Sequence, residues 1–584
     1  MFLPTTQKEM KRLGWSRLDV IIVSGDSYVD TAFNGACLVG KVLLERGFRV
    51  GIIGQPDVSS GADISRLGEP LLFWGVTGGS VDSMVANYTA TKKRRKQDDF
   101  TPGGVNDRRP DRAVIVYANL IRRFFKDTAP IVLGGIEASL RRVAHYDYWD
   151  DRIRRSILFD AKADYLIYGM GERSIVRMAD AIQAGSDPRD IPGVCYRAAS
   201  APSGYIEMPA FERTASDPEA FGRMFEIFYA NAEIPGAKGL FQAHGNRLLI
   251  QNPPAEPLDT PELDRLHELD YERELHPYHR TGGEVRALDT IRFSITSHRG
   301  CYGGCRFCAI AVHQGKAVHW RSQASIVREA ERMTAHPRFR GVIADVGGPT
   351  ANMYGIECRQ RAVSGSCRHR QCLFPEICRK LEPDHRPQLE LLRALRTLPG
   401  IRSIFVASGI RYDLVLADQR SAAEYLKEVA AHHVSGQLKV APEHFDPTVL
   451  RLMGKPSVEV LERFKVMFDA ASQKAHKPQF LTYYLMAAHP GCDEKRMHDM
   501  RKELLGRFGV LPKQVQIFTP TPSTWSSLMY HTGRDPFSGE PVFVEKTLKG
   551  KTRQKQLITG KPDRRAKGSN PSGLRSRKNK RQHL

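Results

Sequence analysis

The sequence has no long hydrophobic run. None of its apolar stretches approaches the roughly 18 uninterrupted residues that a membrane span requires, so we expect no membrane segment. The first residues, MFLPTTQKEMKRLGW, also lack an apolar core of signal-peptide length, which argues against export. These two absences predict a cytoplasmic protein.

Strong compositional bias is absent as well. Hydrophobic residues make up 41% and charged residues 26%, near the averages of globular proteins, which excludes a fibrous or wholly disordered chain. A chain of 584 residues exceeds one ordinary compact domain, so we expect two or three. Cysteines are few, at 10, and the cytoplasm keeps thiols reduced. Where they cluster, metal binding or redox chemistry is therefore favoured over disulfides.

The net charge of +22 is unevenly distributed. Residues 546–584 carry +13 of it, since Asp563 is the only acid among 14 Lys and Arg. The end of the chain also has few apolar residues, so we expect a basic, disordered tail over residues 551–584. Two interpretations stay open for this tail, a solvated extension and a segment that binds RNA through its phosphates.

Strand-like and helix-like patterns alternate through the first 199 residues. The apolar runs at 19–25, 49–56, 71–77, 112–119, 131–138 and 164–172 predict strands, and residues 35–48 have helical spacing. Strand, helix and strand in succession indicate parallel pairing, and therefore an α/β domain. Residues 91–110 are polar and contain Pro and Gly, which predicts a loop. Residues 200–285 have poor strand signals, and we expect a connector with some helix there.

A second α/β series occupies residues 286–550. Its strand-like runs lie at 291–300, 341–348, 403–409, 436–442, 479–488 and 515–522, with helical stretches between them. Six strands with intervening helices predict a partial (β/α)6 barrel.

Three cysteines lie in the glycine-rich loop RGCYGGCRFC, directly after a predicted strand. Cys301, Cys305 and Cys308 have the spacing C-x3-C-x2-C. Thiolates are soft ligands suited to iron-sulfur clusters, and glycines let a loop approach a cubane closely. Three ligands leave one iron open to a cofactor or substrate. The alternative is a structural zinc site, for which His298 or His313 would supply the fourth ligand.

This motif resembles the signature of the radical S-adenosylmethionine (SAM) superfamily, with the aromatic Phe307 before the last cysteine. The resemblance implies a 4Fe-4S cluster whose open iron chelates SAM. It also implies reductive cleavage of SAM to a 5′-deoxyadenosyl radical, which abstracts hydrogen from a substrate, and an external flavodoxin- or ferredoxin-like electron donor. The cofactors carry this chemistry, while the protein positions the reactants and excludes water.

Five further residues stand where the superfamily binds SAM, each at the end of a predicted strand. The superfamily holds the amino group of SAM with a Gly-Gly-Glu turn, in whose place this chain has Pro349 after two glycines. Polar residues in ASGIRYD match the positions for ribose and carboxylate, and LKVAPEHF resembles a stretch of the methylthiotransferases. These residues, with Phe307, are the expected SAM-binding set: Gly347, Gly348, Ser408, Arg411 and Glu443.

Several longer stretches are similar to one family, the YgiQ family of radical SAM proteins. They are GDSYVDTAFNG, GFRVGIIGQPD, VLGGIEASLRRVAHYDYWDDRIRRSI, GGPTANMY, LKVAPEH and AAHPG, and the similarity runs from about residue 16 to about 550. It implies that residues 1–199 form a cobalamin-binding-like, doubly wound domain. The loop GDSYVDTAFNG has Asp26 and Asp30 but lacks the histidine of the Asp-x-His-x-x-Gly motif. We therefore expect no histidine-ligated cobalamin.

Four more cysteines lie in an insertion over residues 351–385. They are Cys358, Cys367, Cys372 and Cys378, separated by eight, four and five residues. Four cysteines so close together can close a metal site. An auxiliary iron-sulfur cluster and a structural zinc site both stay open.

Two functions follow from these patterns. The first is a radical SAM enzyme of unassigned reaction, with RNA modification as one candidate because of the basic tail and the methylthiotransferase-like stretch. The second is a nucleic-acid-binding protein whose iron-sulfur or zinc site is structural. The first predicts cleavage of SAM and the second does not.

Overall fold

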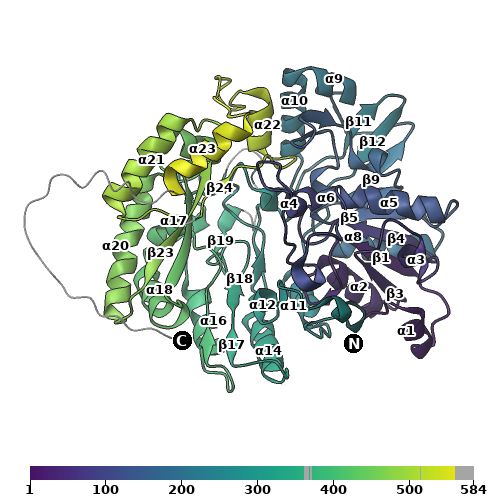
Figure 1. Ribbon diagram of the computed structural model, residues 1–584, viewed down its shortest axis with the longest axis horizontal. Coiled ribbons are helices and arrows are strands. Elements are labelled where there is room, and N and C mark those ends of the chain that lie inside the picture. The colour runs from purple at the N-terminus through teal and green to yellow at the C-terminus, as the bar shows by residue number, and fades with distance from the viewer. Residues whose placement is uncertain (234, 361–366, 368–370, 513, 560–584) are drawn as a thin grey trace, which may run out of the picture.

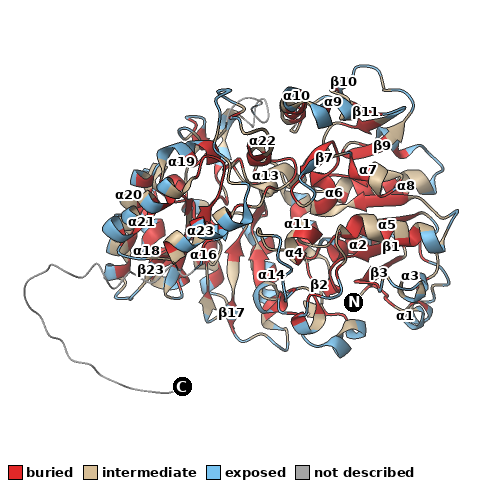
Figure 2. Cartoon of the chain, turned by 45° about the horizontal axis from the view of Figure 1, so that its top comes forward, coloured by how far each residue is buried: buried red, intermediate tan, exposed pale blue. Residues whose placement is uncertain are grey.

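Two α/β domains lie side by side in the computed structural model, which describes residues 1–584 except 234, 361–366, 368–370, 513 and 560–584. The N-terminal domain is purple to teal in Figure 1, and the second domain is teal to yellow. In both, helices cover buried strands (Figure 2). Within the described residues, no helix has both the length and the apolar character needed to span a membrane.

A nine-stranded mixed sheet forms the core of the N-terminal domain, in the order β10-β11-β12-β9-β8-β5-β4-β1-β3. Its parallel part is formed by β3, β1, β4, β5 and β8, as a doubly wound domain requires. The strands are β1 (Val20–Ser24), β3 (Val50–Gly54), β4 (Phe73–Thr77), β5 (Ile131–Gly134), β8 (Tyr165–Ile167), β9 (Val194–Ala198), β10 (Ile206–Met208), β11 (Leu240–His244) and β12 (Arg247–Gln251).

Helices cover both faces of this sheet. Side chains alternate along a strand, so Val20 and Ile22 of β1 join one core while Ile21 and Val23 join the other. The first core contains residues of α2 (Gly35–Glu45) and α8 (Glu172–Gln183), and the second contains residues of α5 (Ala113–Phe124). The predicted α/β, doubly wound architecture is confirmed.

One predicted strand is wrong. Residues 112–119, RAVIVYAN, are part of helix α5, which runs from Ala113 to Phe124. Its buried residues recur at helical spacing, at Val114, Tyr117, Ala118 and Ile121, and pack on the sheet. The β-branched residues in the short run favoured a strand, but packing on the sheet determines the structure.

Residues 200–285 contribute strands as well as helices. Antiparallel β12 pairs with β9 and with β11, and β11 pairs with β10, so the predicted connector extends the N-terminal sheet. Its helices are α9 (Phe211–Ser216), α10 (Pro218–Ala230) and α11 (Thr260–Glu268). Because these strands depend on pairing with β9, their own residues give only weak signals.

The second domain is the predicted partial barrel of parallel strands. Pairing runs from β14 to β18, from β17 to β21, through the bridge of Ile410 with Val440, and on to β22, β23 and β24. The strands are β14 (Ser294–Thr296), β17 (Val342–Ile343), β18 (Asp345–Gly347), β21 (Ser403–Ile404), β22 (Gln437–Glu443), β23 (Phe480–Ala487) and β24 (Gln516–Ile517). Its main helices are α13 (Ala309–His313), α14 (Gln323–Thr334), α16 (Arg386–Arg396), α17 (Tyr412–Ala417), α18 (Ala422–Glu428), α19 (Pro447–Met453), α20 (Val458–Lys474), α21 (Glu494–Arg507) and α22 (Trp525–Thr532).

The start of the predicted tail is ordered, which corrects the expectation of disorder from residue 551. Helix α23 spans Leu548–Thr559, and residues 560–584 lie outside the described residues. Lys551 donates to the hydroxyls of Tyr148 and Tyr530, at 2.8 and 2.9 Å, and Ile558 is buried. Helix α23 therefore joins the barrel domain to the N-terminal domain, and buried contacts outweigh its polar composition.

Lys551 gives the stability of this junction a pH dependence. Burial, together with nearby Lys546 and Lys92, lowers the pKa of Lys551 to about 7. Between this value and the ordinary lysine pKa the unfolded chain holds more protons, so unfolding becomes less favourable as pH rises. In the wild type, the free energy of unfolding should rise by up to about 1.4 kcal/mol per pH unit in this range because of Lys551. We expect this contribution to be absent in Lys551→Met.

Melting temperatures measured by circular dichroism from pH 7 to 9.5 test this expectation. Exposed Lys549 on the same helix provides the matched control, Lys549→Met. If the melting temperatures of both variants and of the wild type change equally with pH, the pKa of Lys551 is not lowered in the folded protein and the expectation is wrong.

Candidate functional site

The cysteine loop lies at the carboxyl end of the barrel strands. It follows β14 and the short strand β15 (His298–Arg299), and Cys308 caps the N-terminus of α13. The loop is closed by backbone hydrogen bonds from Cys308 to the Cys305 carbonyl, at 3.0 Å, and from Cys301 to the Gly315 carbonyl, at 3.3 Å. The structure thus holds the three predicted ligands in one turn beside the barrel opening.

Polar hydrogens surround two of the sulfurs. The N–H of Gly303 donates to Cys301 Sγ at 3.4 Å, and the Arg411 guanidinium donates to Cys305 Sγ at 3.6 Å. A Cβ added to Gly303 would lie 3.2 Å from Cys301 Sγ and 3.1 Å from the Arg411 guanidinium. The glycine therefore leaves room for the sulfurs and the cation.

The thiols are held in an environment that favours a positively charged ligand. Burial raises the pKa of Cys308 to about 12, and the sulfurs of Cys305 and Cys301 add to the rise. Within the described residues, no three His, Cys, Asp or Glu side chains are arranged to hold a metal ion. An iron-sulfur cluster spreads its protein ligands over separate iron atoms, so its cysteines need not converge on one point.

A chain of buried hydrogen bonds fixes Arg411. Asn352 accepts from the Arg411 N–H at 2.7 Å and donates to its carbonyl at 3.1 Å. The Asn352 amide also lies 3.0 Å from His385, whose other ring nitrogen is 2.8 Å from the Asp418 carboxylate. Asp413 pairs with the Arg411 guanidinium. The cation is therefore held in a fixed position against Cys305.

The predicted glycine turn and serine lie together. A Cβ on Gly347 would come within 3.6 Å of the Ser408 hydroxyl, and a Cβ on Gly348 within 2.6 Å of the His298 ring. Ser408 donates its hydroxyl to the Asp345 carboxylate and its N–H to the same residue at 3.1 Å. Only glycine fits at position 348, because His298 packs directly against it.

Glu443 lies at the end of β22 in the left-handed region, with a φ of 69°, where the strand register shifts. Its carboxylate is 3.7 Å from the Lys455 amine, and burial raises the pKa of Glu443. Lys455 also lies 5.9 Å from the ring of Phe307, which contacts His489 edge-on. The backbone of Glu443 is strained where its side chain enters the barrel opening, which is typical of functional positions.

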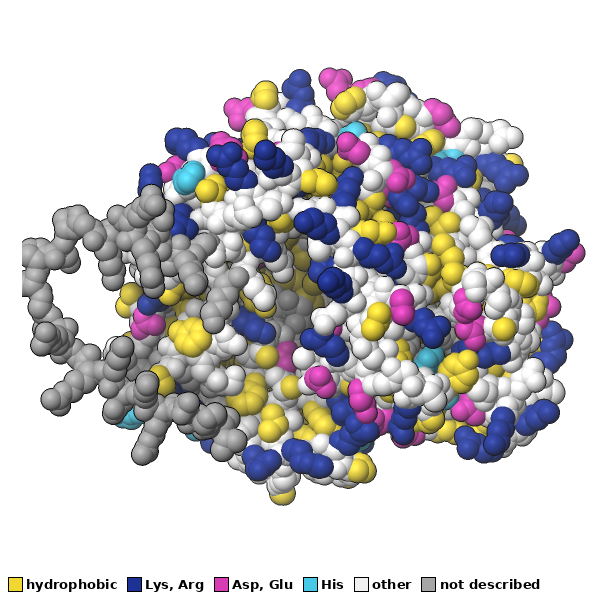
Figure 3. Space-filling view, in the orientation of Figure 1, with side chains coloured by type: hydrophobic (Ala, Val, Ile, Leu, Met, Phe, Trp, Pro, Cys, Tyr) yellow, Lys and Arg dark blue, Asp and Glu magenta, His cyan; other side chains and the backbone are white. Residues whose placement is uncertain are grey.

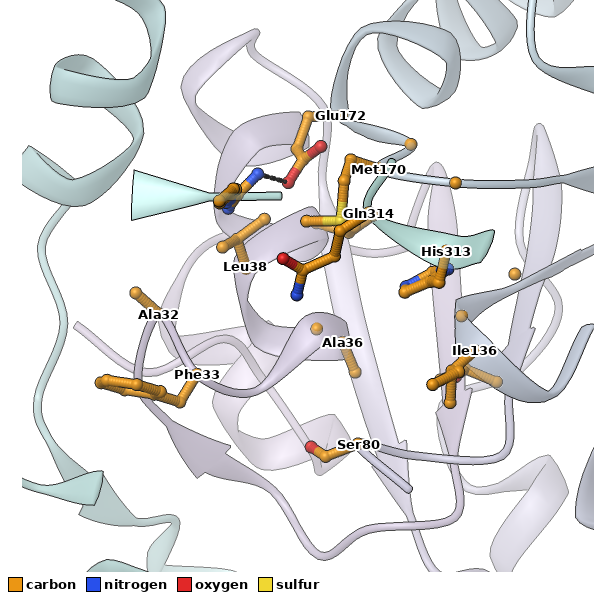
Figure 4. Close-up of a pocket in the computed structure, with 18 of the residues that line it drawn as sticks. Ala32, Phe33, Ala36, Leu38, Ser80, Ile136, Met170, Glu172, His313 and Gln314 are labelled. Carbon is orange, nitrogen blue, oxygen red and sulfur yellow. Dashed lines mark hydrogen bonds and ion pairs between the residues drawn. The ribbon is translucent and has the colours of Figure 1, made fainter. Parts of the chain in front are cut away.

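A cavity of about 530 Å³ borders this site. Its walls include Gly347, Gly348 and Ser408 of the barrel, and also Ser80 and Ile136 of the N-terminal domain. Figure 4 shows side chains of both domains around this space, with His313 and Gln314 facing Ala36 and Leu38. In Figure 3 the face in view is hollowed near its centre, with Lys and Arg side chains around the hollow.

The second set of cysteines packs close to the first. Cys358 lies on β19 (Glu357–Cys358), which pairs with β20 (Leu381–Glu382), and Cys378 donates its N–H to the Cys372 carbonyl at 2.8 Å. Cys378 belongs to an apolar cluster with Tyr302, and Cys358, Cys372 and Cys301 pack against the same cluster. Burial raises the pKa of Cys372 to about 12, and the sulfurs of Cys358, Cys367 and Cys378 contribute. All four predicted residues are therefore near one another.

The acids of the loop after β1 are engaged within the protein. Asp26 accepts from buried Arg109 at 2.8 Å and from Ser80 at 2.7 Å. Asp30 lies 3.1 Å from the Lys41 amine and accepts from Tyr28. Arg109, which belongs to the predicted loop over residues 91–110, thus fixes that loop to the sheet.

Sequence reasoning did not single out Thr350, Asn352, Asp413 or Lys455. The hydroxyl of Thr350 lies 3.7 Å from Cys301 Sγ, and the others fix Arg411 or Glu443. Three of the four stand inside the stretches GGPTANMY and ASGIRYD. These polar residues stand next to the predicted SAM-binding glycines and arginine, and this proximity could have identified them as part of the site.

Comparison with protein families gives two adjacent matches. Residues 2–294 match the family described as Radical SAM N-terminal, and residues 295–504 match the Radical SAM superfamily. The boundary at residue 294 coincides with the start of β14. The first match includes the strands of residues 200–285.

Among curated proteins, the chain is 53% identical over 561 residues to the UPF0313 protein FN0734 of Fusobacterium nucleatum subsp. nucleatum. The alignment covers 96% of this chain and 99% of that protein. Among solved structures, a radical SAM methyltransferase of Kitasatospora setae is 15% identical, with a TM-score of 0.49, and 86% of this chain and 74% of that one are covered. A cobalamin-dependent SAM radical enzyme with aqua-cobalamin bound is 10% identical, with a TM-score of 0.48 and coverage of 90% and 57%.

Proposed function

Since the chain belongs to the UPF0313 family and is a radical SAM enzyme, we propose that Cys301, Cys305 and Cys308 ligate its 4Fe-4S cluster. When bound, the cluster supplies the single electron that splits SAM into methionine and a 5′-deoxyadenosyl fragment able to take hydrogen from a C–H bond. The observation that carries the proposal is the buried Arg411 guanidinium, 3.6 Å from Cys305 Sγ in a loop of three cysteines.

We assign SAM to the edge where the barrel strands end. There the Gly347–Gly348 turn, which lines the adjoining cavity, would hold the amino group, and Asp345 orients the Ser408 hydroxyl for a ribose. Glu443 offers a carboxylate beside Lys455, and the ring of Phe307 lies near the same amine. These residues bind and orient the cofactor and keep water from it.

Formation of 5′-deoxyadenosine tests the proposed function. Anaerobically reconstituted protein, reduced with dithionite, is expected to convert SAM into methionine and 5′-deoxyadenosine in equal amounts. Incorporation of iron and sulfide without any cleavage would favour the alternative, a nucleic-acid-binding protein with a structural cluster. A single zinc in place of iron would favour the same alternative.

The electron donor and the substrate are proposed from the enzyme class and the sequence. A flavodoxin- or ferredoxin-like protein of the cytoplasm would reduce the cluster. RNA remains a candidate substrate because of the basic tail, whose residues 560–584 lie outside the described residues. The closer assignment to the YgiQ family rests on the sequence stretches given above.

We also propose that no histidine-ligated cobalamin is present. The loop after β1 contains no histidine, and its Asp26 and Asp30 are already paired with Arg109 and Lys41. A buried carboxylate that gives up such a partner loses a charge-assisted hydrogen bond. The loop therefore has no group positioned to coordinate cobalt from the sheet side.

The second cysteine set is proposed to hold a further metal centre. Cys358, Cys372 and Cys378 are part of, or pack against, the apolar cluster that Cys301 also contacts, and the sulfurs of Cys358, Cys367 and Cys378 contribute to the raised pKa of Cys372. Four thiolates fit an auxiliary iron-sulfur cluster or a zinc ion. Either metal would pin the insertion beside the catalytic cluster.

Metal content of two variants separates the two sites. We expect the triple variant Cys301→Ala, Cys305→Ala, Cys308→Ala to retain either about four iron atoms or about one zinc per chain. The double variant Cys372→Ala, Cys378→Ala is expected to lose only that metal. Elemental analysis by mass spectrometry is the measurement, and a metal-free triple variant would show that the second set binds nothing.

A further inference from the structure

The cavity between the domains is a compartment distinct from the cysteine loop. Of the described residues that line it, none is Cys301, Cys305, Cys308, Arg411 or Glu443. It meets the proposed SAM site only at the turn of Gly347 and Gly348 and at Ser408. Gly347, Gly348 and Ser408 are therefore a wall that the cavity shares with the proposed SAM site, and a ligand in the remainder of the cavity would lie next to SAM.

The cavity extends over the sheet of the N-terminal domain, where glycines leave space. Ile22, Gly75 and Val132 are neighbours across β1, β4 and β5, and Gly134 follows on the same face as Val132. The backbone of Gly134 is extended, with a φ of −158°, and a Cβ there would meet no atom closer than 3.9 Å. The fold tolerates a side chain at this position, so the glycine serves to keep the cavity open.

Three buried polar atoms in the walls have no hydrogen-bond partner among the described residues; one is Nε2 of His298, which faces Gly348, and the other two lie on Glu172 and His267. Glu172 accepts from Arg299 at 2.7 Å through one oxygen, while its other oxygen has no partner. The Nε2 atom of His267, a residue that is 3% exposed, has none either. Leaving such a group unsatisfied costs about 1–3 kcal/mol, so the atoms on Glu172 and His267 mark places for polar groups of a ligand.

The walls are mainly apolar, although polar side chains such as Gln314 and Thr296 and the carboxylate of Asp345 also line them. Burial lowers the pKa of His313 to about 4 and that of His267 well below its ordinary value, so both rings are neutral. Glu172 and Arg299 neutralise each other. Figure 4 shows Leu38, Ile136 and Met170 around the same space. The lining therefore fits an uncharged, mainly apolar molecule better than a phosphate-bearing one.

We propose that this cavity binds the substrate of the radical reaction, and that the substrate is a small, largely apolar organic molecule with a hydrogen-bonding group. The proposal rests on the proposed function, because the shared wall at Gly348 and Ser408 brings the ligand next to SAM. The volume of about 530 Å³ lies within the range of small-molecule sites. An RNA strand is the competing class of substrate.

Binding of N-phenyl-1-naphthylamine, a neutral apolar molecule with one N–H donor, tests the cavity. We expect saturable binding of the probe to the reconstituted holoprotein in equilibrium dialysis. Gly134→Leu in β5 and Ala36→Leu in α2 each add a side chain to the lining of the cavity and are expected to weaken binding at least tenfold. Gly506→Leu makes the same change at an exposed position of α21 and should leave binding unchanged. Equal binding by all four proteins, or none by the wild type, would overturn the proposal.

Small molecules released on denaturing the purified holoprotein test the substrate class. A neutral organic compound, depleted at least tenfold in Gly134→Leu and retained in Gly506→Leu, would support it. Release of nucleotides, of a corrinoid or of SAM alone from this cavity would overturn it. Because binding is measured without reduction, probe binding with no formation of 5′-deoxyadenosine on reduction would refute the proposed function and leave the cavity as a ligand site.

Discussion

Cys301→Ala is expected to abolish cleavage of SAM, with formation of 5′-deoxyadenosine reduced at least 10³-fold. The three cysteines act together, so losing one should cost about as much activity as losing all three. Removing one of three thiolates leaves two protein ligands for a cluster that already has an open iron. The remaining sulfur of Cys305 would still contact Arg411, so the loop itself is expected to persist. The assay is chromatography of the reduced, reconstituted protein after incubation with SAM.

The matched control is Cys195→Ala. Cys195 is buried in β9, far along the chain from the loop, and burial raises the pKa of its thiol to about 12. This variant is expected to keep full iron content and activity, with only the modest loss of stability that a small core truncation brings. Unchanged cleavage in Cys301→Ala would refute the assignment of the cluster.

Arg411→Gln is expected to lower the reduction potential of the cluster by on the order of 60 mV, which corresponds to a tenfold smaller reduced fraction at a fixed donor potential. The guanidinium lies 3.6 Å from Cys305 Sγ, and its positive charge favours the extra electron. Cleavage of SAM supported by a flavodoxin should fall in proportion. The measurement is a redox titration followed by electron paramagnetic resonance.

Asp413→Asn is the control, because it is expected to shift the reduction potential of the cluster in the opposite direction to Arg411→Gln. Asp413 pairs with the Arg411 guanidinium and is itself buried, so removing its negative charge is expected to raise the potential. A structural disturbance alone would not shift the two variants in opposite directions. Arg411→Lys should recover part of the loss, because it keeps the charge but not the fork geometry. Equal potentials in all three would show that Arg411 acts only on folding.

The parts of the fold that could be predicted are those that local sequence determines. The runs that became β1, β3 and β4 are short and apolar, and the run that became α5 looked the same but continues with helical spacing to Phe124. Edge strands such as β10 depend on partners distant in sequence. Packing against those partners cannot be read from the strand itself.

The candidate site divides in the same way. The spacing of Cys301, Cys305 and Cys308 is local, so the sequence alone indicates a cluster. The contacts of Asn352 with Arg411 and of His385 with Asp418 join residues 59 and 33 positions apart. Only the folded partial barrel brings these groups together. The cavity is formed by two domains, so the strand ends of the N-terminal domain indicate only one of its walls.

The contact of Lys551 with Tyr148 and Tyr530 has a consequence for the order in which the protein is made. Synthesis begins at the N-terminus, so the N-terminal sheet and most of the barrel can fold before α23 exists. Until then the two hydroxyls lack their buried donor, and the junction between the domains is incomplete. A nascent chain stalled before residue 551 should therefore contain two folded domains that are not yet joined at this contact.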